Sequence, residues 1–224
     1  MKLYMHPIST VSRPVRLFLA ENGIKVEEVV VDLFSGAHHQ EPYRSLNPSR
    51  QVPLLEDDDL RLSESSAILK YLADKYDLPS YPKDLKKRAK VNEVMDWLNT
   101  GFYRDFGYGL VYPQLFPHHK RRSDEAHAGA IEWGQANSKA WLKVLNDHYI
   151  GPTNQYLTGN QITIADYFGA GLVSIAELID CDLADYPNVR RWLGNMKTLK
   201  NWNTVNEVFT GFVRGNKGKE FARV

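Results

Sequence analysis

The stretch QVPLLEDDDLRLSESS, residues 51–66, carries the most informative local pattern in this chain of 224 residues. Two short apolar runs, Pro53–Leu55 and Leu60–Leu62, flank an acidic turn, which is typical of a β-hairpin. Ser65 or Ser66 can then cap a helix. The apolar face of that helix would comprise Ile68, Leu69, Leu72 and Tyr76. The stretch therefore predicts two antiparallel strands that lead directly into a helix.

The residues before the hairpin predict a β-α-β unit. The runs Lys2–Met5 and Val26–Val31 are β-branched or aromatic and suit strands. Between them, Pro14 can lie near the start of a helix and Gly23 can end it. A β-α-β unit followed by β-β-α predicts a small α/β sheet domain over residues 1–77.

The rest of the chain has the period of helices. Pro79 and Pro82 make residues 78–85 the best candidate for a linker. Thr163 and Asp166 have the spacing of a capping box that begins a helix. The first helical stripe comprises Val91, Val94, Met95, Leu98 and Phe102. We therefore predict an all-α domain over residues 86–224.

Charge and cysteine content exclude several classes of function. The chain has 28 Lys and Arg against 27 Asp and Glu, so its formal net charge of +1 supplies no basic field for nucleic acid or anionic lipid. Its one cysteine, Cys181, excludes an internal disulfide and a four-thiolate zinc site. No leader or membrane span is recognisable. We expect a soluble, cytoplasmic protein with no nucleic-acid or membrane partner.

The turn between the first strand and the first helix contains three hydroxyl side chains, Ser9, Thr10 and Ser12. Unpaired N–H groups and the helix dipole at such a turn stabilise a bound anion. A thiol held there would move toward thiolate. From position alone, a hydroxyl that only caps the helix is the favoured interpretation.

Two further segments offer groups for a peptide ligand. Val52 precedes Pro53 and is extended, and a cis bond would let Val52 present its backbone to a ligand, although base rates favour a trans bond. Glu64 and Ser65 lie together at a predicted helix N-terminus, which suits an α-amino-acid end. A plain helix cap is the alternative.

Paired histidines occur twice. His38 and His39 have no third ligand nearby in the sequence, so we expect solvated loop residues and no metal site. The basic segment 118–122 is expected to be an exposed connection between helices.

As an ordered set, these segments resemble the cytosolic glutathione transferases. The resemblance rests on Ser9 and on residues 47–55, 62–68 and 162–167, and extends over residues 3–215. It is strongest toward theta-like members, including bacterial ones. It implies a thioredoxin-like domain at 1–77 that binds glutathione and a helical domain at 86–224 that contributes the electrophile pocket.

The family resemblance also implies roles for individual residues. Ser9 would hold the glutathione sulfur as thiolate by donating its hydroxyl proton, with Thr10 and Ser12 as competitors. Val52 would pair with the cysteinyl unit before a cis Pro53. The γ-glutamyl end would contact Glu64 and Ser65, and the glycyl carboxylate would contact His38, His39, Arg50 and Gln51. Gln51 departs from the lysine that theta members tend to carry.

The implied reaction is attack of the thiolate on a hydrophobic electrophile, or displacement of halide. Arg104 could contact an anionic substrate. Any single aromatic residue of the run 102–112 could instead belong to the helical core. The expected pocket walls are Ile8, Phe34, Phe102, Tyr103, Phe106, Tyr108 and Tyr112. The alternatives are a non-catalytic glutathione-binding or interaction module and a glutathione-dependent isomerase or dehalogenase. Val11 replaces the cysteine of zeta-like isomerases, and the family implies a homodimer.

Overall fold

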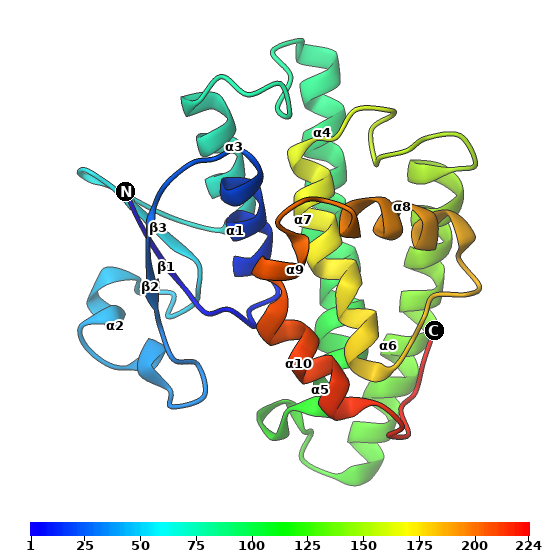
Figure 1. Ribbon diagram of the computed structural model, residues 1–224. Helices are drawn as coiled ribbons and strands as arrows, with labels where there is room; N and C mark the ends of the chain where they lie inside the picture. The colour runs from blue at the N-terminus through cyan, green and yellow to red at the C-terminus, as the bar shows by residue number, and fades with distance from the viewer.

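The computed structural model describes residues 1–224 and consists of a sheet part followed by a helical part (Figure 1). The strands are β1 (Lys2–Met5), β2 (Glu27–Val30), β3 (Leu54–Asp57) and β4 (Leu60–Ser63). Their order in the sheet is β2-β1-β3-β4, with β1 parallel to β2 and antiparallel to β3. β3 and β4 form the predicted hairpin, in which Leu55 lies opposite Leu62. The predicted α/β architecture is confirmed.

Two helices of the first part pack against the sheet, α1 (Ser12–Glu21) and α3 (Ser65–Lys75). Their apolar faces are buried, because Phe18, Ile68 and Leu72 have no exposed surface. Two short helical segments, η1 (Ala37–His39) and α2 (Tyr43–Leu46), lie between β2 and β3. α1 lies between the sheet and the helical part (Figure 1), so the turn before α1 faces both.

Two local expectations from the sequence are wrong. Glu64, not a serine, occupies the N-cap position of α3, at φ 66°, and Ser65 is the first residue of that helix. The bond between Val52 and Pro53 is cis, against the base-rate expectation of trans and in agreement with the family resemblance. The cis bond lies just before β3, and Glu64 lies between β4 and α3.

The helical part continues in one path from α4 (Leu85–Trp97) through η2 and η3 to α5. The stripe Val91, Val94, Met95, Leu98 and Phe102 is buried as predicted. In η2 and η3 the turns are wider than those of an α-helix, with i→i+5 bonding. The remaining bounds are η2 (Leu98–Phe102), η3 (Arg104–Val111), α5 (Tyr112–Leu115), η4 (Pro117–His119), α6 (Asp124–Val144), η5 (Leu145–Ile150), α7 (Ile164–Val173), η6 (Ser174–Ile179), α8 (Pro187–Lys197), α9 (Trp202–Val205) and α10 (Glu207–Asn216).

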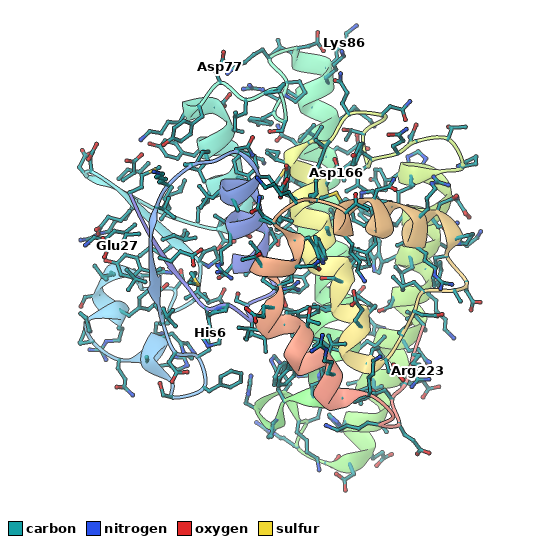
Figure 2. All side chains as sticks on the ribbon, viewed as in Figure 1. His6, Glu27, Asp77, Lys86, Asp166 and Arg223 are labelled. Atoms are coloured by element: carbon teal, nitrogen blue, oxygen red, sulfur yellow. The ribbon has the colours of Figure 1, made fainter.

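The predicted capping box at the start of α7 is confirmed. The Asp166 carboxylate accepts the Thr163 backbone N–H at 2.8 Å, and it also accepts from Leu157 N–H and Trp192 Nε1. Figure 2 shows Asp166 inside the helical part, whereas Arg223 lies at its rim. One fully buried carboxylate thus ties together α7, α8 and the loop before α7.

The two parts of the chain meet closely between α1 and α7. Gly171 permits this approach, because a Cβ at that position would lie 2.3 Å from Pro14 Cγ. Arg13, only 2% exposed, reaches across to Gly171 O, Ser174 Oγ and Asn206 Oδ1. The first turn of α1 is therefore fixed by the helical part. The exact division at residues 78–85 stays a prediction.

None of the helices combines the length and apolar character that crossing a membrane requires.

Candidate active site

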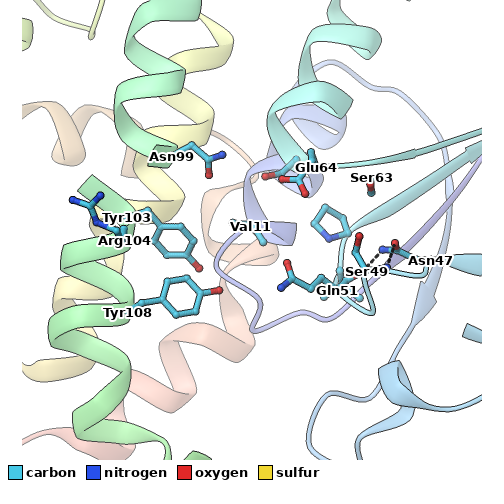
Figure 3. A pocket seen from close by; sticks show the side chains of 13 residues that line it. Val11, Asn47, Ser49, Gln51, Ser63, Glu64, Asn99, Tyr103, Arg104 and Tyr108 are labelled. Atoms are coloured by element: carbon cyan, nitrogen blue, oxygen red, sulfur yellow. Dashed lines mark hydrogen bonds between the residues drawn. The ribbon is translucent and has the colours of Figure 1, made fainter. Parts of the chain in front are cut away.

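A cavity of about 240 Å³ opens between the sheet part and the η2–η3 helical path (Figure 3). One wall belongs to the sheet part and the other to the helical part, so neither part forms the cavity alone. Its lining comprises Val11, Asn47, Ser49, Gln51, Val52, Pro53, Ser63, Glu64, Ser65, Asn99, Tyr103, Arg104 and Tyr108. Val52, Pro53, Glu64, Ser65 and Gln51 are thus brought together as the sequence predicted.

The loop before β3 presents free backbone groups to this cavity. The N–H and C=O of Val52 make no hydrogen bond within the chain. The neighbouring carbonyl of Gln51 is held by Asn47 Nδ2 at 2.8 Å and by the Tyr43 hydroxyl. The loop is therefore fixed on one side, while Val52 keeps a donor and an acceptor for an extended ligand.

The start of α3 supplies a second polar end. Ser65 is 5% exposed and Glu64 is exposed, and both line the cavity. The first intrahelical bond is donated by Ile68 to Glu64 O at 2.9 Å, so the N–H groups of the preceding helical residues remain free. A carboxylate suits those N–H groups and an ammonium suits Glu64.

The opposite wall is aromatic and carries hydroxyls. Figure 3 shows the hydroxyls of Tyr103 and Tyr108 directed toward the sheet part. The Tyr103 and Tyr112 hydroxyls lie 2.7 Å apart, and Tyr112 lies 2.6 Å from Thr10 Oγ1. Burial raises the pKa of Tyr112 to about 12, so these hydroxyls stay protonated near neutral pH. The chain of hydroxyls joins the cavity wall to the turn that holds Ser9.

Ser9 lies in the turn between β1 and α1 and is 9% exposed. Its Oγ accepts the Ser12 backbone N–H at 3.2 Å, and its own N–H is donated to His6 O at 3.0 Å. Burial lowers the pKa of His6, whose Nδ1 accepts the Ile8 N–H. The acceptor side of the Ser9 hydroxyl is therefore engaged, while its proton has no partner within the chain.

A second cavity, of about 520 Å³, lies on the other side of this turn. Ile8 lines the second cavity and Val11 lines the first, so Ser9 lies in the segment between them. The second cavity is lined by Ile8, Phe34, Gln114, Leu115, Val208, Gly211, Phe212, Gly215, Asn216, Lys219 and Phe221. Apolar side chains dominate its walls, as expected for the site of a hydrophobic molecule.

Several predicted residues line neither cavity. Ser12 is fully buried, and its Oγ has no hydrogen-bond partner. Ser9, Thr10, His38, His39 and Arg50 are also absent from both linings, and the turn that holds Ser9 reaches the cavities through its neighbours Ile8 and Val11. The rings of the two histidines lie against each other at a tilt of 43°, with centroids 3.9 Å apart, and no cluster of three or more acidic, histidine or cysteine side chains could hold a metal ion. The segment at 118–122 connects helices and is mostly exposed, as expected.

The prediction of one pocket with all the named aromatics as walls is wrong. Phe102 and Phe106 have no exposed surface because they point into the helical core. Tyr112 is also buried and serves the hydroxyl chain. The remaining predicted walls are divided, with Tyr103, Arg104 and Tyr108 at the first cavity and Ile8 and Phe34 at the second.

Sequence reasoning missed several lining residues. Asn99 precedes Tyr103 by one helical turn, so their shared face was a usable signal for the first cavity. Asn47 lies directly after the short helix α2, and its sequence context indicates no role for it beyond its place in the segment 47–55. No local pattern pointed to Asn216 or Lys219, which reach the second cavity from the C-terminal segment.

Comparison with known proteins agrees with this architecture. Residues 1–74 match the glutathione S-transferase N-terminal domain, and residues 127–199 match its C-terminal domain. Human glutathione S-transferase theta-1 is 34% identical over 80% of this chain and 72% of its own length. The chain belongs to the glutathione S-transferase family. Human theta-2 is 31% identical over 89% of this chain and 81% of its own length, so the likeness to the theta class is shown.

Solved structures of glutathione transferases share the whole fold. A delta-class enzyme from Nilaparvata lugens has a TM-score of 0.80 and 31% identity, over 96% of this chain and 98% of its own. Human theta-2, solved with glutathione and an unknown ligand, has a TM-score of 0.83 and 27% identity, over 98% of this chain and 91% of its own. A possible transferase from Rhodopseudomonas palustris has 30% identity and a TM-score of 0.79, covering 92% of this chain and 89% of its own. Because relatives from animals match as well, a bacterial origin stays a prediction.

Proposed function

We propose that this glutathione transferase binds glutathione in the first cavity and activates its thiol through Ser9. The observation that carries the proposal is the state of the Ser9 hydroxyl. Its oxygen accepts the Ser12 N–H at 3.2 Å, and its proton is left for a ligand. A sulfur that accepts this proton in a hydrogen bond is stabilised as thiolate, and the start of α1 adds a favourable dipole.

The first cavity has matching groups for the rest of the tripeptide. The free N–H and C=O of Val52 suit the backbone of the cysteinyl unit. Glu64 and the N-terminus of α3, with Ser65, suit the ammonium and carboxylate of the γ-glutamyl end. Glutathione in the human theta-2 structure supports this ligand. For the glycyl carboxylate, Gln51 is the one proposed residue that lines the cavity, and His38, His39 and Arg50 would act from outside it.

The second cavity is the proposed site of the electrophile. The thiolate sulfur attacks an electrophilic carbon, forming a carbon–sulfur bond, and a leaving group such as halide departs with the bonding electron pair. Holding both reactants next to the Ser9 turn, which contributes Val11 to one cavity and Ile8 to the other, would bring the sulfur and the electrophilic carbon into contact and convert an encounter between two molecules into a reaction within one complex. We also propose a cytoplasmic homodimer, as the family resemblance implies, and light scattering of the purified protein tests the dimer.

Two measurements test the thiol chemistry. Wild type should be retained on immobilised glutathione, and bound glutathione should show the ultraviolet absorbance of a thiolate near neutral pH. Ser9→Ala should lose most of that absorbance, whereas Ser12→Ala should retain it because the Ser12 side chain is completely enclosed while Ser9 keeps 9% of its surface exposed. Circular dichroism checks the fold, since Ser9→Ala also removes the hydrogen bond that Ser9 Oγ accepts from the Ser12 N–H, worth about 1 kcal/mol.

The outcomes separate the alternatives. A protein that binds no glutathione, either immobilised or free, would contradict the proposal. Binding with a thiolate signal that survives Ser9→Ala would move the role to Thr10 or to the backbone N–H groups. Binding without turnover of an activated aryl halide would indicate a glutathione-binding module.

A further inference from the structure

One end of the second cavity is polar and contains hydrogen-bond donors. Asn216 lies there at the end of α10, is 6% exposed, and has no partner for its Nδ2. Lys219 Nζ donates to Asn216 Oδ1 at 2.7 Å. Because Asn216 Nδ2 is enclosed by the protein, Asn216 acts on the cavity through its oxygen, which holds the Lys219 ammonium in place.

The orientation of the Asn216 amide is fixed by chemistry. An ammonium group has three donors and no acceptor, so the amide atom that faces Lys219 must be the oxygen. The N–H₂ group is therefore the side without a partner. Lys219 uses one N–H on this contact and retains donors and its full charge for a ligand.

The rest of the lining supplies no competing acceptor side chain. Gln114 is the other polar residue, and its amide is already paired, since Nε2 donates to Leu110 O and Ala222 O and Oε1 accepts the Ala222 N–H. No aspartate or glutamate lines the cavity. Its side walls are apolar, with Leu115 and Phe212 from α5 and α10 facing Ile8 and Phe34 from the sheet part.

We propose that the second cavity selects an apolar molecule that carries a carboxylate, held by Lys219, with Asn216 as the residue that positions Lys219. The carboxylate accepts from Lys219 Nζ, which Asn216 Oδ1 holds at 2.7 Å, and the apolar body lies against Phe212 and Ile8 near the Ser9 turn. Because the cavity is assigned to the electrophile, this inference rests on the proposed function and narrows its substrate class to apolar electrophilic acids.

A binding experiment tests the selection without any chemistry. The probes are 2-naphthoate and 2-naphthamide, which share an apolar body and differ in charge, and their affinities are measured by isothermal titration calorimetry. Wild type should bind the carboxylate about tenfold more tightly, the size of one charge-assisted hydrogen bond near the surface. Lys219→Met keeps the aliphatic stem and should abolish the preference, and Lys219→Arg should restore most of it.

Lys217→Met is the matched control, because Lys217 is exposed, lies two residues away and does not line the cavity. It should retain the tenfold preference. Asn216→Leu, checked by circular dichroism, should reduce the preference as well. Equal affinities in wild type, no binding of either probe, or a preference that survives Lys219→Met would overturn the proposal.

A second pair of compounds links the selection to turnover. The rate of glutathione conjugation, as kcat/KM, is compared for 4-chloro-3,5-dinitrobenzoate and its neutral amide. Wild type should favour the acid, and Lys219→Met should lower kcat/KM for the acid about tenfold while changing the amide little. If no conjugation occurs but the naphthoate preference holds, the proposed reaction fails and the carboxylate site stands. If both dinitro compounds react equally in wild type and in Lys219→Met, the carboxylate site fails.

Discussion

Arg13 provides a test of how the two parts of the chain are joined. It is a fully buried cation whose contacts include no carboxylate, because its guanidinium donates to Asn206 Oδ1 at 2.7 Å, to Ser174 Oγ and to Gly171 O. It also lies 3.7 Å from the centre of the Phe209 ring. We predict that removing one acceptor, by Asn206→Leu, destabilises the protein more than removing the cation, by Arg13→Met.

The expected magnitudes follow from what each change leaves buried. Burial lowers the pKa of Arg13 to about 10. At about 1.4 kcal/mol for each pKa unit, the charged form is disfavoured by roughly 3 kcal/mol. Arg13→Met removes that cost and leaves the neutral acceptor Asn206 Oδ1 unpaired, for a net loss of about 1–3 kcal/mol. Asn206→Leu keeps the charge and removes its shortest hydrogen bond, for a loss of about 3–5 kcal/mol.

Urea denaturation followed by tryptophan fluorescence measures both variants and the double variant. Because the double variant buries no charge, it should be more stable than Asn206→Leu alone. Arg16→Met is a control on the same helix. That side chain pairs with the partly exposed Glu28 and donates to Val205 O at 3.1 Å, so its loss should change the free energy of unfolding by about 1–2 kcal/mol, less than Asn206→Leu. A larger loss for Arg13→Met than for Asn206→Leu would refute the reasoning.

Three further changes should alter stability in urea or heat denaturation. Asp166→Asn replaces a buried carboxylate that accepts several N–H donors, so a loss of about 3 kcal/mol is expected, and a loss below 1 kcal/mol would contradict that role. Gly134→Ala would place a Cβ 2.4 Å from a backbone carbon of the crossing helix, so a loss of about 1–3 kcal/mol is expected, and full stability would show that the helices can separate freely. Burial lowers the pKa of His6, His38 and His119. Because the unfolded chain binds these protons near pH 6.5, the free energy of unfolding should fall as the pH drops through that value. Equal urea midpoints at pH 7.5 and 5.5 would contradict this linkage.

The fold could be predicted from the sequence because its signals are local. The hairpin at 51–66 and the capping box at Thr163 and Asp166 depend on residues within one turn or one strand pair, and the structure shows both. The prediction of a serine cap for α3 is wrong because Glu64 takes a positive φ of 66°, which a non-glycine residue rarely adopts and which the local sequence does not indicate.

The candidate site could be predicted only in part, because it combines local and distant contributions. Val52, Pro53, Glu64 and Ser65 lie on two neighbouring segments of the same sheet part, so their proximity followed from the hairpin. The polar end of the second cavity instead depends on the C-terminal segment returning to the Ser9 turn. Nothing in the pattern of residues 207–224 specifies that path, since it is set by the packing of α10 against η6 and by hydrogen bonds from Gln114 and Gln135 to the backbone of the last residues.

The geometry of η3 explains why the aromatic residues divide between the wall of the first cavity and the helical core. In a regular α-helix, residues five apart lie about 140° apart around the axis, so Tyr103 and Tyr108 would face different neighbours. The i→i+5 turns of η3 wind more slowly, and both side chains reach the same cavity while Phe106 points into the core. Wide turns of this kind often occur at functional sites. The same slow winding leaves Tyr112 beside both Tyr103 and Thr10, so the wall of the first cavity and the Ser9 turn are held by one chain of hydroxyls. A change in the winding of η3 would therefore move the wall of the first cavity and the Ser9 turn together.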